Sequence, residues 1–388
     1  MLVVDCGGGG SSSGGTPPPA PVQNQVAVTV AHGVSGMPNI VTTSVTICVH
    51  GTSNCQTIDN VQVDTESFGL RLVSGAVSSQ ILSSLPTETT GGATLAECTI
   101  FGDGYTWGTV RTADLTIGGE TASNLPIAII GDLAASTVPS SGCSNGAPQP
   151  VLETSASQLG ANGILGIGVA PYDCGPNCSS ATGSGYFACP SSGSCVQTAV
   201  STTQAVTNPV ARFATDNNGV MLTMSPITSG TGAASASGTL TFGIGTRSNN
   251  VMTASTQYTT SWNGDVRVPS NSAALAFFDS GSNGYFFSDA SITQCGSNFA
   301  GFYCPSSTET HDVTVSAFTA NTTSVTTVPM QIADAASLFA TGNLAFNDLG
   351  GTFPSNLIDI GLPFFYGKTV FYGIDQSASG GQSPYIAF

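Results

Sequence analysis

The sequence predicts an all-β protein with two lobes and only a few short helices. Only 7% of its 388 residues are charged, and 48 glycines, 21 prolines and long Ser/Thr tracts disfavour helix. Short apolar runs alternate with turn residues along most of the chain, as in antiparallel sheets. Two of these runs end in an aspartate, at Asp64 and Asp279, which suggests a duplicated β unit.

The N-terminal half is expected to consist of antiparallel strands. A hairpin that Cys48 and Cys55 could close leads directly into the strand that ends at Asp64, so a disulfide there would stiffen one rim of a site. The predicted strands are residues 26–30, 44–49, 56–63, 113–117 and 126–130.

Two short helices are expected among these strands. The first covers residues 208–215, because Asn208 is a good N-cap and Pro209 suits the first helical turn. The second covers residues 333–339. Helices of this length add little to the core, so the fold class remains all-β.

A composition change marks the expected boundary between the lobes. Residues 228–237 consist only of Gly, Ala, Ser and Thr, and a strand pattern resumes at residues 238–245. We therefore predict an N-terminal lobe over residues 26–230 and a C-terminal lobe over residues 231–388.

The N-terminus resembles the tether of a bacterial lipoprotein. Cys6 is followed by a flexible Gly/Ser run and then by the stiffer Pro17-Pro18-Pro19. This resemblance implies a disordered tether over residues 1–25, a lipid anchor on Cys6, and a bacterial cell-envelope location, periplasmic or on the surface. The five residues before Cys6 are too few for a signal peptide, and Asp5 replaces the usual small residue. The alternatives are a disordered end with a free thiol and a secreted protein.

Eleven cysteines indicate an oxidising compartment. Four pairs lie close in sequence with turn residues between their members, which favours local disulfides, and a fifth pair follows by elimination. The alternative for four of these cysteines is the nested pairing of Cys174 with Cys195 and of Cys178 with Cys189. The predicted pairs are Cys48/Cys55, Cys174/Cys178, Cys189/Cys195, Cys295/Cys304 and, by elimination, Cys98/Cys143.

The charge balance excludes several classes of partner. The net charge is −16 with only six Lys and Arg residues, so nucleic acid is not an expected partner and a membrane is expected only through the lipid. His32, His50 and His311 lack the spacing of a metal site, and we expect neither a metal nor a cofactor. We expect a monomer.

In residues 61–67 and 276–282 an apolar run ends in Asp, and a hydroxyl residue follows the Asp. These two segments, with three others in the expected order along the chain, resemble segments of pepsin-like aspartic peptidases. Residues 162–168 and 358–365 are similar to the Gly-bearing strands that pass beneath the catalytic loops in that family, and residues 99–108 resemble its flap hairpin. The resemblance implies a bilobal acid-protease fold with two antiparallel, barrel-like β lobes.

The resemblance also implies the chemistry. Asp64 and Asp279 would share a proton and activate a water that attacks a peptide bond; such a carboxylate pair is a standard illustration of coupled titration. Thr65 and Ser280 would hydrogen-bond across the lobe junction. The remaining residues of the implied site are Ser67 and Ser282, which would orient the carboxylates, Gly281 in the second loop, and Phe101, Gly102, Tyr105 and Trp107 in the flap.

Three positions depart from the family pattern. Glu66 stands where the family has Gly, Phe101 where its flap has Tyr, and Arg71 where Trp is common. Three functions therefore compete: an aspartic endopeptidase that cleaves peptides bound between the lobes, an inactive module of the same fold that binds peptide, glycan or protein, and a β-rich surface adhesin. Glu66 favours the second, because it adds bulk and negative charge beside the catalytic pair.

Overall fold

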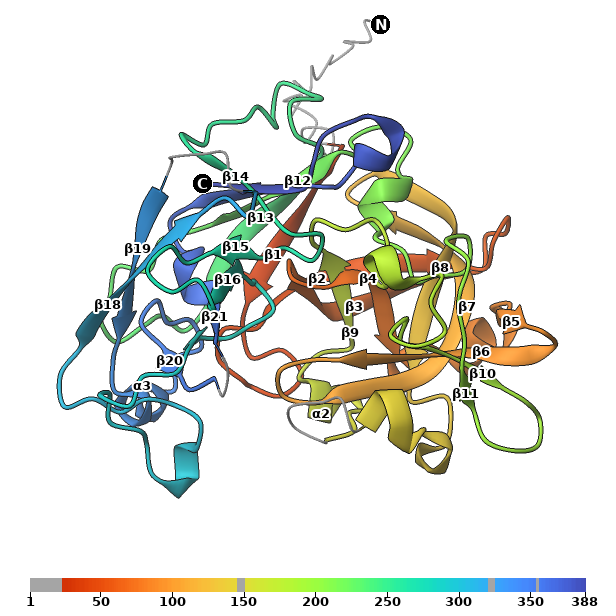
Figure 1. The fold of residues 1–388 in the computed structure, drawn as a ribbon, viewed down its shortest axis with the longest axis horizontal. Helices are drawn as coiled ribbons and strands as arrows, with labels where there is room; N and C mark the ends of the chain where they lie inside the picture. Colours follow the sequence, from red (N-terminus) through yellow and green to blue (C-terminus); the bar gives the residue numbers. More distant parts are fainter. Residues whose placement is uncertain (1–22, 145–150, 320–324, 354–355) are drawn as a thin grey trace, which may run out of the picture.

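A computed structural model describes residues 23–144, 151–319, 325–353 and 356–388 (Figure 1). Strands dominate this part of the chain. Its three α-helices have at most six residues each, and none of the described helices is long and apolar enough to cross a membrane. Cys6 and nearly all of the expected tether lie outside the described residues. The helices are α1 (Ser79–Ser84), α2 (Ala156–Leu159) and α3 (Ala335–Ala340).

Six strands of the first half close into a barrel. They follow the order β2-β3-β9-β4-β8-β7, and the barrel closes because β7 also pairs with β2. Its interior is filled by aliphatic side chains from all six strands. The strands are β2 (Val41–Cys48), β3 (Cys55–Asp64), β4 (Phe68–Val73), β7 (Tyr105–Ile117), β8 (Glu120–Ile130) and β9 (Gly163–Ile167).

The same sheet extends beyond the barrel at both ends. A hairpin layer continues from β7, with strands β5 (Thr89–Thr90), β6 (Ala93–Ile100), β10 (Tyr186–Cys189) and β11 (Val196–Gln197). From β2 the sheet passes into the second half of the chain through β1 (Gln25–Val30), β13 (Ala236–Phe242), β12 (Gly219–Met224), β22 (Thr369–Gly373), β23 (Tyr385–Ala387) and β14 (Gln257–Thr259). Because β1 pairs with β13, the two halves share main-chain hydrogen bonds.

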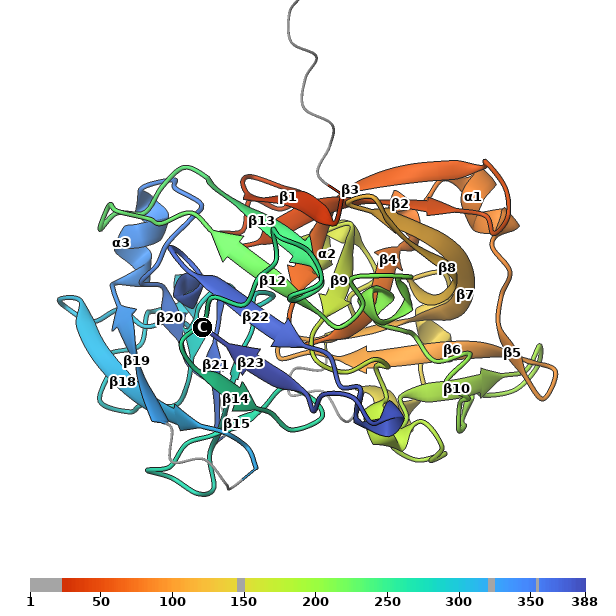
Figure 2. The same ribbon diagram turned by 90° about the horizontal axis from the view of Figure 1, so that it is seen from above.

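A separate seven-stranded sheet belongs entirely to the second half (Figure 2). It carries the strand that leads to Asp279, and a parallel strand, β21, lies beside that strand. The order is β19 (Val325–Ile332), β18 (Glu309–Ser316), β15 (Val266–Arg267), β16 (Leu275–Phe278), β21 (Leu357–Ile360), β17 (Tyr285–Phe286) and β20 (Gly350–Gly351).

The predicted helix at residues 208–215 is shorter than expected. Asn208 does accept a hydrogen bond from the Val210 backbone, but the helix is a 3₁₀ turn over Pro209–Arg212. Phe213 then takes an extended conformation and packs its ring in the core, 3% exposed. Burial of that ring therefore outweighs continuation of the helix.

All five predicted disulfides are confirmed, including the bridge between Cys98 and Cys143, and the nested alternative is wrong. The bridges join Cys48 to Cys55, Cys98 to Cys143, Cys174 to Cys178, Cys189 to Cys195 and Cys295 to Cys304.

Candidate functional site

Two similar loops lie at the ends of two strands. The first Asp loop (residues 64–67) follows β3, and the second Asp loop (residues 279–282) follows β16. Each strand has a parallel neighbour, β9 for β3 and β21 for β16. Each Asp loop is therefore packed on a parallel strand that pairs with the strand leading into the loop.

A glycine at each supporting strand leaves room for the loop above it: Gly166 lies on β9, and Gly361 directly follows β21. A Cβ atom at Gly166 would lie 2.6 Å from the Phe68 nitrogen, and one at Gly361 would lie 2.1 Å from the Gly284 oxygen. Both distances are far shorter than van der Waals contact with backbone that cannot move aside. Both glycines lie in the two segments, residues 162–168 and 358–365, that were expected to pass beneath the Asp loops.

Hydroxyl groups join the two loops. The Thr65 hydroxyl donates to the Phe278 oxygen (3.0 Å) and accepts from the Ser280 nitrogen (2.9 Å). The Ser280 hydroxyl donates to the Val63 oxygen (2.7 Å). Both residues are buried, at 1% and 0% exposure, so these bonds are shielded from water. They hold the ends of two strands from different sheets together.

Each aspartate is oriented by its own loop. Ser67 donates its hydroxyl to Asp64 Oδ2 (2.5 Å), while the Glu66 nitrogen donates to Oδ1 (2.8 Å). Ser282 donates to Asp279 Oδ2 (2.8 Å), and the Gly281 nitrogen donates to Oδ1 (2.7 Å). The serine three residues after each Asp therefore makes the same hydrogen bond, to Oδ2 of that Asp, in both loops.

The two carboxyl groups both lie next to Gly281. A Cβ atom at Gly281 would lie 3.0 Å from Asp64 Oδ1 and 3.0 Å from Asp279 Oδ1, so the two oxygens are at most twice that distance apart. Burial and the charge of Asp64 raise the pKa of Asp279 well above its ordinary value. Among the described residues, no cation forms an ion pair with either aspartate.

Glu66 lies beside this pair and reaches the second half of the molecule. A Cβ atom at Gly264 would lie 2.4 Å from Glu66 Oε2, so the carboxyl group packs directly on that turn. Burial raises the pKa of Glu66 well above its ordinary value, and the nearby charges of Asp265, Asp279 and Asp64 raise it further. The raised pKa widens the pH range in which Glu66 is neutral and does not repel the two aspartates.

The predicted flap is the hairpin formed by β6 and β7. The Phe101 nitrogen bonds to the Gly104 oxygen (2.9 Å) at its turn, and a Cβ atom at Gly102 would lie 3.3 Å from the Phe353 ring of the second half. Tyr105 and Trp107 do not serve the carboxyl pair. Both are buried in a cluster with Phe187, and the Trp107 indole donates to the Thr137 hydroxyl (3.0 Å).

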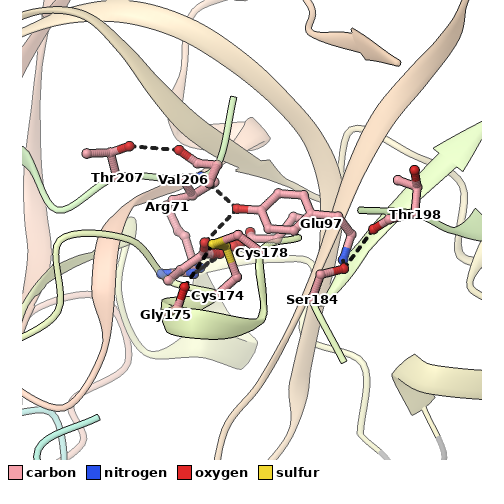
Figure 3. Close-up of a disulfide and its surroundings, with 12 residues drawn as sticks. Arg71, Glu97, Cys174, Gly175, Cys178, Ser184, Thr198, Val206 and Thr207 are labelled. Carbon is pink, nitrogen blue, oxygen red and sulfur yellow. Dashed lines mark hydrogen bonds and ion pairs between the residues drawn. A yellow bond between two sulfur atoms is a disulfide. The ribbon is translucent and has the colours of Figure 1, made fainter. Parts of the chain in front are cut away.

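Arg71, on the strand β4 that follows the first Asp loop, binds the flap strand β6 (Figure 3). Its guanidinium is 1% exposed and contacts Glu97 Oε1 (2.6 Å) and Thr99 Oγ1 (2.9 Å) on β6, and Asp173 Oδ2 (3.2 Å). The Arg71 charge holds the pKa of Glu97 below its ordinary value although burial opposes this, whereas burial and the Glu97 charge raise that of Asp173. Asp173 also accepts the Tyr186 hydroxyl (2.7 Å), next to the Cys174–Cys178 bridge.

The sequence analysis assigned no role to a third buried carboxyl group. Asp359 on β21 is 4% exposed, and its Oδ2 lies 2.5 Å from Ser282 Oγ. Its Oδ1 is buried and has no hydrogen-bond partner. Burial and the Asp64 charge raise its pKa well above the ordinary value. The available signal was a lone acidic residue between Ile358 and Ile360 in an otherwise apolar strand.

Potential metal ligands gather at one place in the described part of the chain, away from the two Asp loops. Cys295, Cys304 and Asp334 lie close together, but the two sulfurs are joined in a disulfide and cannot act as thiolate ligands.

The model of one protein family matches residues 20–388. The chain therefore belongs to that family, which is described as proteins of unknown function (DUF3443). Comparison with curated proteins gives no match.

Proposed function

We propose that this member of the DUF3443 family is an aspartic-type endopeptidase with a pepsin-like bilobal fold. The observation that carries the proposal is that the carboxyl groups of Asp64 and Asp279, which come from separate sheets, lie close together next to Gly281. Two such carboxyls can hold one proton and one water between them. One group then acts as the base for that water, while the other protonates the carbonyl oxygen of the substrate.

The hydrogen bonds around the pair support this function. Backbone and hydroxyl donors reach both oxygens of each aspartate, which fixes the two carboxyl groups before substrate binds. The flap hairpin lies near the second half through Gly102 and Phe353, as expected of an element that covers an extended peptide. In a surface adhesin the two Asp loops would be unrelated turns, and unrelated turns would have no reason to hydrogen-bond to each other.

A peptide-library digestion from acidic to neutral pH tests the proposal. We expect cleavage at acidic pH and a loss of about 10³-fold or more in both Asp64→Asn and Asp279→Asn. Asp312→Asn, an exposed aspartate on β18, serves as the matched control and should cleave like the wild type. Full cleavage by either active-site variant would contradict the proposal.

Glu66 favours a second candidate, a peptide-, glycan- or protein-binding module without catalysis. Its side chain fills the space between the first Asp loop and Gly264, where the peptidase family leaves only a glycine. Glu66→Gly distinguishes the two. If the chain is a peptidase restrained by this side chain, the substitution should raise kcat/KM by about tenfold or more. Absence of cleavage in both the wild type and Glu66→Gly would favour the binding module.

The cellular location of the protein is a further proposal. The five disulfides support an oxidising compartment. We propose the bacterial envelope, with the lipid on Cys6, or secretion. Metabolic labelling with a radioactive fatty acid, in the wild type and in Cys6→Ser, tests the anchor.

A further inference from the structure

A single hydroxyl group lies between two carboxyl groups beneath the second Asp loop. Ser282 Oγ is 2.8 Å from Asp279 Oδ2 and 2.5 Å from Asp359 Oδ2. A serine hydroxyl has one proton, so it can donate to only one of these oxygens. The other short contact is a hydrogen bond only if the second carboxyl group carries a proton and donates it to Ser282 Oγ.

The surroundings identify the carboxyl group that carries this proton. Asp279 already accepts a backbone hydrogen bond from Gly281, whereas Asp359 is 4% exposed and its Oδ1 has no donor at all. An ionised carboxylate in that position would be buried without compensation. The charged groups whose fields reach this cluster are Asp64, Asp279 and Glu66, all acidic, and no cation of the described chain pairs with Asp359.

We propose that Asp359 is a positioning residue. It stays protonated and donates a hydrogen bond to Ser282 Oγ, so that the Ser282 hydroxyl donates its own hydrogen bond to Asp279. This inference rests on the proposed peptidase function for its catalytic consequence. The chain of two donors stabilises the ionised form of Asp279 and keeps the carboxyl group in one orientation. No proton leaves the three residues, and no bond other than hydrogen bonds changes.

The first Asp loop provides an internal comparison. In the parallel pairing, Gly166 lies opposite Asp64, and Ile164 lies two residues before it on β9. On β21, Asp359 lies two residues before Gly361. In the described part of the chain, the Ser67 hydroxyl therefore bonds to one acidic side chain, Asp64. A buried carboxyl group at this position, that of Asp359, therefore lies beneath the second Asp loop and not beneath the first.

Two substitutions at position 359 separate donation from packing. Asp359→Asn keeps a donor for Ser282 and cannot ionise, whereas Asp359→Ile copies the apolar residue found below the first loop. We expect Asp359→Asn to retain the acidic limb of the cleavage profile. Asp359→Ile should lower kcat about tenfold at unchanged KM and move the acidic limb upward by about one pH unit. The opposite order, with the isoleucine variant active and the asparagine variant impaired, would overturn the proposal.

A second measurement does not depend on cleavage. A raised pKa means that protonated Asp359 contributes stability below the unfolded-state pKa, and this contribution is lost as pH rises through the folded-state pKa. The Tm of the wild type should therefore fall more than that of Asp359→Asn between about pH 4 and about pH 8. Parallel curves would overturn the proposal. If no variant cleaves peptide but the Tm curves diverge, the peptidase function fails while the protonated Asp359 stands.

Discussion

The two Asp loops share a plan and differ in what surrounds them. In both, a strand leads into Asp, a serine follows three residues later, and a parallel strand below has a glycine on it or directly after it. Two residues after the aspartate, the first loop has Glu66 and the second has Gly281. Two residues before the glycine of the parallel segment below, the first loop has Ile164 and the second has Asp359. This difference makes the two carboxyl groups inequivalent, because only Asp279 has an acidic neighbour beneath it.

The supporting glycines should give the largest effects. In Gly361→Ala the new Cβ would meet the Gly284 oxygen at 2.1 Å, and in Gly166→Ala it would meet the Phe68 nitrogen at 2.6 Å. We expect the free energy of unfolding to fall by about 2–4 kcal/mol in each, with Gly361→Ala the more severe.

Urea denaturation measures this difference. Gly230→Ala is the matched control, because a Cβ atom at Gly230 meets no neighbour, and its free energy of unfolding should not fall. If Gly166→Ala and Gly361→Ala matched this control, the loops would not rest on these strands as described.

The hydroxyls that join the loops should rank next. Thr65→Val loses two hydrogen bonds and leaves the buried Ser280 nitrogen without an acceptor, so the free energy of unfolding should fall by about 2–3 kcal/mol. Ser280→Ala loses only the bond to the Val63 oxygen, and about 1 kcal/mol is expected. Equal losses, measured in the same urea series, would show that the two hydroxyls do not differ as the structure indicates.

Glu66 should affect how stability depends on pH. Its raised pKa means that the neutral form contributes stability at low pH, which is lost as pH rises through the folded-state pKa. Glu66→Gln removes that loss, so the variant should gain about 1 kcal/mol over the wild type at neutral pH and little at acidic pH. Thermal denaturation at several pH values measures it. A gain of the same size at every pH would contradict the assignment.

The flap should give the smallest effect. Burial and the charge of Asp103 raise the pKa of Glu153 to about 7, and a Cβ atom at Gly104 would lie 3.1 Å from the Glu153 carboxyl carbon. Stability of the turn end of the hairpin should therefore decrease as pH rises through about 7, and Glu153→Gln should remove this change. Amide hydrogen exchange of β6 and β7 measures it. Equal pH dependence in both proteins would contradict the prediction.

The sequence alone predicted the features that depend on local pattern. The strand ends at Asp64 and Asp279 could be predicted because apolar runs stop there at residues that favour turns. The disulfides could be predicted because four pairs are local and Cys98 and Cys143 remained.

Features that depend on tertiary packing could not be predicted in the same way. Strands β7 and β8 extend well beyond their expected cores at residues 113–117 and 126–130, because each pairs with neighbours on both sides. The direction of Trp107 depends on a cluster with Phe187 that sequence spacing does not reveal. Asp359 lies in residues 358–365, a segment whose resemblance to the peptidase family rests on its glycine. Its contact with Ser282 joins residues 77 positions apart, so local sequence pattern does not reveal it.

The titration of Asp279 tests the central claim most directly. Carboxyl ¹³C NMR of the wild type should give Asp279 a pKa well above the ordinary range, because burial and the charge of Asp64 both favour its protonated form. In Asp64→Asn the pKa of Asp279 should fall by about one unit or more. An unchanged titration of Asp279 in that variant would show that the two carboxyl groups do not interact, and would contradict the account.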